Sequence, residues 1–336
     1  MSKKMYLVWT VLFSSLLVLM LAGLFWLASR PESGPSTQPA ATTAPAPGGP
    51  PVRIGLMPER DIFAMRRRYK VLADYVAARL GRPVVLSTTN TYEGMLPDFE
   101  DSQIELAFAG SLVAAMAMDR YGAKVLVKPE LPGGISTYRG VIFVRADSPV
   151  TKIAQLKSKI VAMLRTTTAG NLFPSCQMAR MGVLGKPDAF KPLWVGTHDD
   201  VANEVLAGRA DAGAIKNLRL DALLQEHPDW KIRRLVESKE VPNNALLVRA
   251  DLAESLGPRI REILLTMDGE AQGRQALQGF GAVRFIPCMQ EQYRLIYCMA
   301  EHIGPAWSVI GIDGPPPRTP PGIVISKDEK CCDANS

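Results

Sequence analysis

Short runs of β-branched and other apolar residues alternate with helical patterns along most of this chain of 336 residues. Residues 52–57 predict a strand. Apolar side chains spaced three and four apart over residues 62–80 predict an amphipathic helix, which Gly81 should end. Further strands are expected at residues 84–88, 104–108 and 124–127. Such alternation is typical of an α/β fold with mainly parallel strands.

A second series of the same kind follows, with strands expected at residues 160–164, 193–195, 210–215 and 232–236 and a helix at 199–206. Two α/β lobes are therefore expected. Two similar strands, residues 140–147 and 244–251, bracket this series, and both end in Val-Arg-Ala-Asp. We interpret them as the two crossovers between the lobes, which makes the first lobe discontinuous and places a cleft between the pair. Chance similarity of two strands is the alternative.

The N-terminal region indicates the compartment. Residues 5–28 carry no charged side chain, and at about 1.5 Å per residue they are long enough to cross a bilayer. Because Lys3 and Lys4 precede this run, we expect residues 1–30 to be a membrane anchor with the rest of the chain on the extracytoplasmic side, periplasmic or cell-surface. A cleaved secretory signal is the alternative. Residues 31–51 are rich in Pro, Ala, Thr and Gly and predict a tether.

Charge and motif content argue against several functions. The chain has 39 Lys and Arg against 33 Asp and Glu, and this net charge of +6 is too small to indicate a nucleic-acid partner. It has no His-Glu-x-x-His, Gly-x-Ser-x-Gly or Cys-x-x-Cys motif. Cys298 and His302 lie four apart on an expected helix, but two ligands are too few for a metal. We therefore expect no enzyme activity, metal or cofactor.

The sequence leaves the roles of Cys288, Cys298, Cys331 and Cys332 open. An intervening helix would hold Cys288 and Cys298 roughly 15 Å apart, beyond the range of a disulfide. Cys331 and Cys332 lie in a polar tail, where the sequence assigns them no role.

Small hydroxyl residues occur where expected strands run into helices. Residues 166–170 read Thr-Thr-Thr-Ala-Gly after the strand at 160–164, and Gly110 with Ser111 forms the same kind of junction after residues 104–108. Free backbone amides at a helix N-terminus, with threonine hydroxyls as extra donors, favour an anion. An ordinary helix N-cap is the alternative. Two such junctions that face each other across a cleft would fit a small tetrahedral oxyanion.

Several short motifs occur in a specific order and spacing. They are Ile-Gly-Leu-Met-Pro at 54–58, Arg-Tyr at 68–69, Leu-Ala-Asp-Tyr at 72–75, Thr-Tyr-Glu-Gly at 91–94, Ala-Phe-Ala-Gly-Ser at 107–111, Ser-Thr-Tyr-Arg-Gly at 136–140, Thr-Thr-Ala-Gly at 167–170 and Phe-Pro at 173–174. In this combination the chain resembles the phosphonate, phosphite and phosphate substrate-binding proteins of ABC importers. The resemblance extends over about residues 54–304.

The resemblance implies a type II periplasmic binding fold, in which two lobes close on the ligand by a hinge at the crossovers. It implies an extracytoplasmic component of an ABC importer whose partners are a permease and its ATPase. The implied solute-binding domain spans residues 52–310, with one lobe at about 52–139 and 249–310 and the other at about 146–242, before an irregular tail at 311–336. By residue-wise carry-over, Thr167 and Thr168 donate hydrogen bonds to the oxyanion, and the cage is completed by Tyr92, Ser111, Tyr138 and His198.

The sequence departs from the family where a ligand substituent would lie. Ala169 removes one hydroxyl from the turn, and Asn243 with Asn244 stands where binders of aminoalkylphosphonates have an acidic residue. Lys216 lies near another position where an acidic residue is expected. A cationic ligand tail is therefore disfavoured, and we expect phosphite, phosphate or a simple phosphonate, with Lys216 and Asn244 at the ligand. The alternatives are a binding protein for a sulfonate or another organic anion, and a membrane-tethered ligand sensor.

Overall fold

The computed structural model of the chain describes residues 48–57, 62–89, 91–92, 94–326 and 329–333. The expected membrane anchor at residues 1–30 and most of the expected tether lie outside these residues. None of the described helices is both long and apolar enough to cross a membrane. The residues from 48 onward belong to one compact unit.

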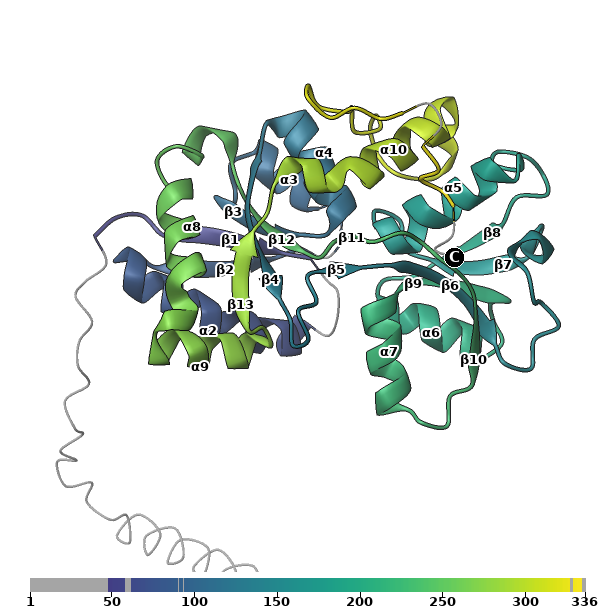
Figure 1. Cartoon of the computed structure of the whole chain (residues 1–336), viewed down its shortest axis with the longest axis horizontal. Helices are drawn as coiled ribbons and strands as arrows, with labels where there is room; N and C mark the ends of the chain where they lie inside the picture. The colour runs from purple at the N-terminus through teal and green to yellow at the C-terminus, as the bar shows by residue number, and fades with distance from the viewer. Residues whose placement is uncertain (1–47, 58–61, 90, 93, 327–328, 334–336) are drawn as a thin grey trace, which may run out of the picture. The chain divides into compact units, whose positions relative to one another are not determined.

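Six of the described strands form one sheet, in the order β13-β4-β12-β3-β1-β2 (Figure 1). They are β1 (Val52–Leu56), β2 (Val84–Thr88), β3 (Leu106–Ala109), β4 (Lys124–Glu130), β12 (Ala245–Val248) and β13 (Arg284–Pro287). β1 is parallel to β2 and β3, whereas β12 is antiparallel to β3 and β4. The four expected strands of this series are confirmed. The sequence pattern does not indicate β13, because only Phe285 of its residues is buried.

Helices cover both faces of this first sheet. α2 (Ile62–Leu80), α8 (Gly257–Thr266) and α9 (Ala271–Phe280) share an apolar core with one face, in which the rings of Tyr69 and Phe280 lie 5.0 Å apart. α3 (Met95–Glu100) and α4 (Ser111–Tyr121) pack on the other face. The helix predicted over residues 62–80 is confirmed, and Gly81 ends it with a left-handed φ of 69°.

Five further strands form a second sheet, in the order β10-β6-β9-β7-β8 among the described residues. They are β6 (Gly140–Arg145), β7 (Ile160–Met163), β8 (Lys191–Trp194), β9 (Ala212–Lys216) and β10 (Ile232–Glu237). β7 is parallel to β8 and β9, and β6 is antiparallel to β9 and β10. Figure 1 shows α5 (Phe173–Arg180) on one side of this sheet and α6 (His198–Leu206) with α7 (Asn217–Glu226) on the other. The expected strands and the helix at 199–206 are confirmed.

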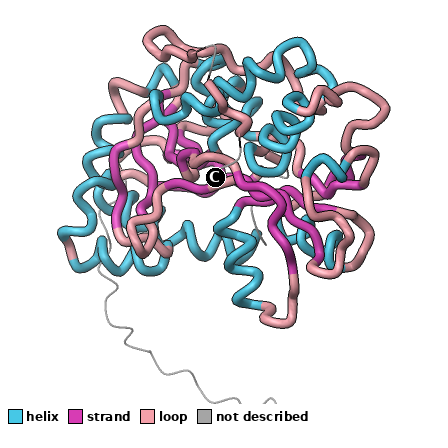
Figure 2. Tube along the Cα trace, turned by 45° about the vertical axis from the view of Figure 1, so that its right-hand side comes forward, coloured by secondary structure: helices cyan, strands magenta, loops and turns pink. Residues whose placement is uncertain are grey.

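The connections between the two sheets correct one expectation. The similar strands at residues 140–147 and 244–251 are not the crossovers, because β6 pairs inside the second sheet and β12 inside the first. The chain crosses just before each of them, where β5 (Thr137–Tyr138) pairs antiparallel with β11 (Val241–Pro242). Figure 2 shows this extended chain joining the two groups of strands. An alternating apolar pattern does not reveal which partner an extended segment pairs with, so the sequence indicated the strands but not the point of crossing.

The C-terminal part of the chain is cross-linked. α10 (Arg294–Ile303) packs against α4 and α5, and a 3₁₀ helix (Gly304–Val309) follows it. Cys176 is bonded to Cys332 and Cys298 to Cys331, with Cα atoms 5.5 and 5.9 Å apart. Cys288 is a buried free thiol and is not bonded to Cys298, as its spacing predicts. Cys331 and Cys332, to which the sequence assigns no role, are therefore the residues that tie the tail to the domain.

Candidate ligand-binding site

Three helical segments begin close together at the carboxyl ends of strands. β3 leads through Gly110 into α4, β7 leads through Thr167 into a single π-helical turn (Thr168–Leu172) that continues as α5, and β8 leads through Thr197 into α6. Backbone amides of a first helical turn lack intrahelical acceptors, and the helix dipole makes this end positive. Such junctions at the ends of parallel strands are suited to an anion.

A small pocket lies where these junctions meet, with residues of both sheets and their connections in its wall. Its volume is about 20 Å³, on the scale of one or two water molecules. The lining residues are Met57, Tyr92, Gly110, Leu112, Tyr138, Thr166, Thr167, Thr168, Ala169, His198, Lys216 and Asn244. No acidic residue is among them. Seven of the eight predicted site residues therefore lie around one pocket, and only Ser111 is outside its lining.

The threonine turn comprises Thr167 and the π-helical residues Thr168–Leu172. One of its two threonine hydroxyls is hydrogen-bonded within the turn, and the other is not. The Thr167 hydroxyl accepts a hydrogen bond from the Gly170 amide at 3.0 Å and donates to the Leu164 carbonyl at 3.2 Å. Thr167 is therefore an ordinary helix N-cap, which is the alternative to an anion site for residues 166–170. The Thr168 hydroxyl is buried in the pocket wall and has no hydrogen-bond partner among the described residues. A buried hydroxyl is costly to leave unpaired, so this group is suited to a ligand.

Ser111 lies behind the pocket wall and contacts Tyr138. Its oxygen lies 2.6 Å from the Pro242 carbonyl oxygen and 3.2 Å from the Tyr138 phenolic oxygen. A carbonyl accepts only, so the single Ser111 hydrogen goes to Pro242 and its oxygen is left to accept from Tyr138. Ser111 therefore positions the Tyr138 ring, and it lies where α4 meets the crossover strand β11.

Lys216 brings a positive charge to the pocket from the end of β9. Its side chain is buried, and its ammonium donates to the Asn243 and Asn244 side-chain oxygens at 2.6 and 3.4 Å. The ammonium also lies 4.6 Å from the centroid of the Tyr138 ring, within the range of a cation–π contact. These amide and ring partners are neutral. A buried ammonium in the pocket wall attracts an anion.

His198 is the first residue of α6 and is 4% exposed. The two carboxylates that follow it are engaged by other groups. Asp200 accepts from the Thr197 amide at 2.9 Å in a capping box, and both oxygens of Asp199 accept from Arg219 at 2.5 and 2.8 Å. The hydrogen bonds with Asp199 raise the pKa of the Arg219 guanidinium, and Glu226 contributes in the same direction. The ion pair with Arg219 therefore compensates the charge of the Asp199 carboxylate beside the positive end of α6.

A second, larger pocket adjoins the first and shares His198, Lys216 and Asn244 with it. Its volume is about 150 Å³. Most of its other lining side chains are aromatic, aliphatic or basic, namely Arg68, Tyr69, Phe108, Pro129, Leu131, Leu218, Arg219 and Phe280. None of its lining residues is acidic. The small pocket contains the threonine turn, and the larger one combines aromatic and aliphatic walls with the side chains of Arg68 and Arg219.

Sequence reasoning did not name several residues of the small pocket as site residues, although Gly110 and Thr166 belong to the junctions that it identified. Met57 and Leu112 contribute apolar wall, and Gly110 allows the chain to approach closely, since a Cβ there would lie 3.2 Å from the Met57 methyl group. Apolar residues at these positions are indistinguishable in sequence from ordinary core. Thr166 belongs to the same threonine run as Thr167 and Thr168, which is the signal that identifies it.

The sequence is similar to those of known proteins. The family model described as an ABC transporter, phosphonate, periplasmic substrate-binding protein matches residues 54–293. The chain is 25% identical over 248 residues, 69% of its length and 75% of the relative, to the phosphate-import protein PhnD of Mycolicibacterium smegmatis. It is 22% identical over 214 residues, 62% of its length and 63% of the relative, to the phosphonates-binding periplasmic protein of Escherichia coli.

A solved structure shows the same fold. PhnD1 from Prochlorococcus marinus, in complex with methylphosphonate, superposes with a TM-score of 0.65 at 18% identity, over 75% of this chain and 98% of that one. At this identity the similarity establishes the two-domain α/β periplasmic binding fold.

Proposed function

The chain belongs to the family of phosphonate periplasmic substrate-binding proteins of ABC transporters, and on this premise we propose that it binds a small phosphorus oxyanion in the pocket between its two lobes. Family membership implies a location outside the cytoplasm and a permease with its ATPase as partners. The family is one of binding proteins and not of enzymes. Phosphite, phosphate and simple phosphonates such as methylphosphonate are the ligands that we propose for this chain.

The observation that carries the proposal is the buried Thr168 hydroxyl, which has no hydrogen-bond partner among the described residues, in a pocket whose described lining contains no acidic side chain. A tetrahedral oxyanion offers three or four acceptor oxygens. Thr168 would donate one hydrogen bond through its hydroxyl, the first-turn amides would donate others, and Lys216 would supply opposite charge. Tyr92, Tyr138 and His198 would enclose the remaining surface of the anion.

Ligand capture would follow from motion about the crossovers. β5 and β11 connect the lobes, and each strand is two residues long, so small backbone changes there would open the pocket to solvent. Closure would remove water from around the anion. In a pocket of low dielectric each hydrogen bond from an amide or hydroxyl contributes more than it does in water.

A substitution at Thr168 tests the proposal. In a thermal-shift screen of the purified chain against phosphite, phosphate and methylphosphonate, a ligand at about 100 times its Kd stabilises by roughly 2.7 kcal/mol, a shift of several degrees. Thr168→Val keeps the side-chain shape and removes the hydroxyl, so we expect Kd to rise about tenfold or more.

Thr266→Val is the matched control, because the exposed Thr266 hydroxyl donates to the Glu262 carbonyl of its own helix at 2.9 Å. It should leave Kd unchanged. Equal thermal shifts for the wild type and Thr168→Val would contradict a role of this hydroxyl, and the absence of any shift with phosphorus oxyanions would contradict the proposed ligand class.

The larger adjoining pocket supports a second candidate ligand class. Its aromatic and aliphatic walls would accommodate the organic part of a sulfonate or another organic anion, with the acidic group in the small pocket. Alkylsulfonates belong in the same screen, and a larger shift with them than with phosphite would favour this alternative. A sensory role of the same site would be indicated by the absence of permease and ATPase genes beside the gene for this chain.

We further propose that residues 5–28 anchor the protein in the membrane and that residues 31–51 tether the domain near its permease. A tether of this kind raises the effective concentration of the domain at its partner. Sequencing of the mature N-terminus distinguishes the two possibilities, because an intact N-terminus supports the anchor and a start beyond residue 28 indicates a cleaved signal.

A further inference from the structure

We propose that the C-terminal segment, described over residues 310–326 and 329–333, holds the ligand-binding ends of α4 and α5 in place, with Asn171, Cys176 and Cys332 as positioning residues. The inference builds on the proposed function, because those helices begin at the proposed ligand pocket. The segment contains no helix or strand in its described residues, so its position depends on the side-chain and disulfide contacts it makes.

The segment is covalently joined to the helix that follows the threonine turn. Cys332 is bonded to Cys176 in α5, and α5 continues directly from the π-helical turn that begins at Thr168. The Gln177 side-chain amide also donates to the Cys332 carbonyl, and Arg180 pairs with Asp333 at 3.2 Å. The neighbouring Cys331 is bonded to Cys298 in α10. Two consecutive residues therefore tie the end of the chain to two different helices.

The same segment contacts α4 on the side of the first sheet. The Arg120 guanidinium donates to the Asp313 carbonyl at 3.0 Å and to the Pro315 carbonyl, and Arg318 pairs with Asp119 at 3.0 Å. These contacts lie at the last turn of α4, and the first residue of the same helix, Ser111, follows Gly110 in the pocket wall. Figure 1 shows the yellow C-terminal chain running past α4 and α10 to α5. The segment therefore spans from one lobe to the other.

Asn171 links the segment to the threonine turn itself. Its side chain is fully buried within the turn Thr168–Leu172. The Asn171 amide nitrogen donates to the Arg165 carbonyl at 2.6 Å and to the Ile310 carbonyl at 2.8 Å, and its oxygen accepts from Ser175 at 2.8 Å. One side chain thus fixes both ends of the turn and the first residue of the C-terminal segment. A shift of the segment would be transmitted directly to the turn.

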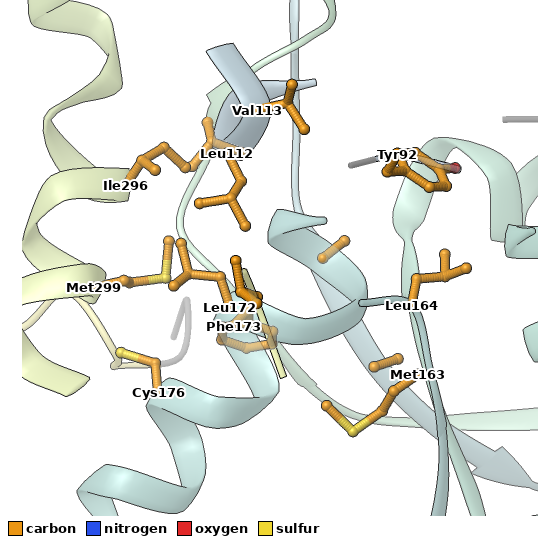
Figure 3. Packing of buried hydrophobic residues seen from close by; sticks show 14 of the residues in the cluster. Tyr92, Leu112, Val113, Met163, Leu164, Leu172, Phe173, Cys176, Ile296 and Met299 are labelled. Carbon is orange, nitrogen blue, oxygen red and sulfur yellow. The ribbon is translucent and has the colours of Figure 1, made fainter. Parts of the chain in front are cut away.

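Apolar packing by α10 fills the space between the two lobes on this side. Figure 3 shows Ile296 of α10 directed toward Leu112 of α4, and Met299 beside Leu172 and Phe173 of the threonine turn and α5. All five side chains are buried. Opening of the pocket by separation of the lobes would expose this packing unless α10 moved with one of them. The disulfide between Cys176 and Cys332 favours the arrangement in which the pocket residues are together.

The expected effect on binding follows from the population of that arrangement. The apparent Kd equals the intrinsic Kd divided by the fraction of ligand-free protein that is already in the binding-competent arrangement. If the segment is released from α5, the ligand-free protein should open more often and bind more weakly. The bound protein should remain closed, because the ligand contacts themselves are unchanged.

The test uses the full-length chain with the double substitution Cys176→Ser and Cys332→Ser. We expect Kd for phosphite, measured by calorimetry, to rise about tenfold, and the radius of gyration of the ligand-free protein in small-angle scattering to increase. Saturating phosphite should restore the wild-type radius. The matched control is Cys298→Ser with Cys331→Ser, which removes a disulfide to α10 only and should change Kd less than threefold.

Unchanged Kd and unchanged radius in the Cys176→Ser, Cys332→Ser variant would overturn the inference, as would an equal effect of the control pair. If the wild type binds no phosphorus oxyanion, the proposed function fails, and the scattering comparison still decides whether the segment restrains the lobes. If the disulfide variant does not fold, Asn171→Asp provides the second test. A carboxylate there faces two carbonyl oxygens, so Kd should rise at least tenfold, and an unchanged Kd would overturn the inference.

Discussion

Lys216→Met is expected to weaken the binding of phosphite by about 100-fold or more. Lys216 is the one Lys or Arg among the described residues that line the small pocket, and a charge-assisted hydrogen bond to an anion contributes roughly 1.5–3 kcal/mol. Methionine keeps the length of the apolar stem and removes the ammonium. Titration calorimetry of the purified variant with phosphite measures the effect.

Stability separates this loss of affinity from a loss of folding. The Asn243 oxygen that accepts from Lys216 also accepts from the Asn244 amide at 2.9 Å, so it keeps a donor in Lys216→Met. An apolar side chain of similar size fills the same buried space and avoids the cost of removing a charge from water. The melting temperature should therefore stay at or above the wild-type value. Lys231→Met, at an exposed lysine of the same lobe, is the control, and a Kd within threefold of wild type for Lys216→Met would contradict the account.

Gly170→Ala is expected to abolish measurable phosphite binding and to destabilise the protein. A Cβ at this position would lie 2.6 Å from the Thr167 hydroxyl, 2.7 Å from the Leu164 Cβ and 3.0 Å from the Leu164 amide nitrogen. Two of these neighbours are backbone or stem atoms that cannot rotate away, so the threonine turn must shift. Overpacking of this kind costs roughly 1–3 kcal/mol, and a displaced turn no longer directs Thr168 into the pocket.

Thermal melting and calorimetry of Gly170→Ala measure the two effects together. Gly269→Ala is the matched control, because a Cβ at Gly269 would meet no atom within 4 Å. We expect this control to bind phosphite as the wild type does. Wild-type affinity in Gly170→Ala would mean that the turn does not hold the ligand.

Much of the fold can be predicted from the sequence because its elements have clear local patterns. The alternation of strands and helices in two series follows from apolar periodicity, and the helix Ile62–Leu80 follows from spacings of three and four. The position at which the chain crosses between the lobes does not follow from such local patterns. β5 and β11 are two residues long, and their pairing is a long-range contact that no local pattern encodes.

The disulfides were also outside the reach of local patterns. The chain has five cysteines, and four of them pair across 156 and 33 positions. A chain expected outside the cytoplasm offers a usable signal, since cysteines there tend to pair. Adjacent cysteines at 331 and 332 lie in a segment without periodicity, and only the packing of α5 and α10 determines which partner each one meets.

More of the candidate site than of the packing around it could be predicted from the sequence. Thr167, Thr168 and His198 follow strands and begin helices, so their convergence is a consequence of the topology. The different uses of Thr167 and Thr168 were beyond prediction, because they depend on which hydroxyl faces the Gly170 amide. Ser111 follows the same junction pattern, but the nearby Pro242 carbonyl takes its hydrogen, and that contact is 131 positions away in sequence.

The most direct test of the central claim is a calorimetric comparison of phosphite with 2-aminoethylphosphonate on the purified full-length chain. Among the residues that the structure describes, none that lines either pocket is acidic and could pair with the amine, and Lys216 would repel it. The account predicts that phosphite binds at one site per chain and at least tenfold more tightly than 2-aminoethylphosphonate. Tighter binding of 2-aminoethylphosphonate, or no binding of phosphite, would contradict it.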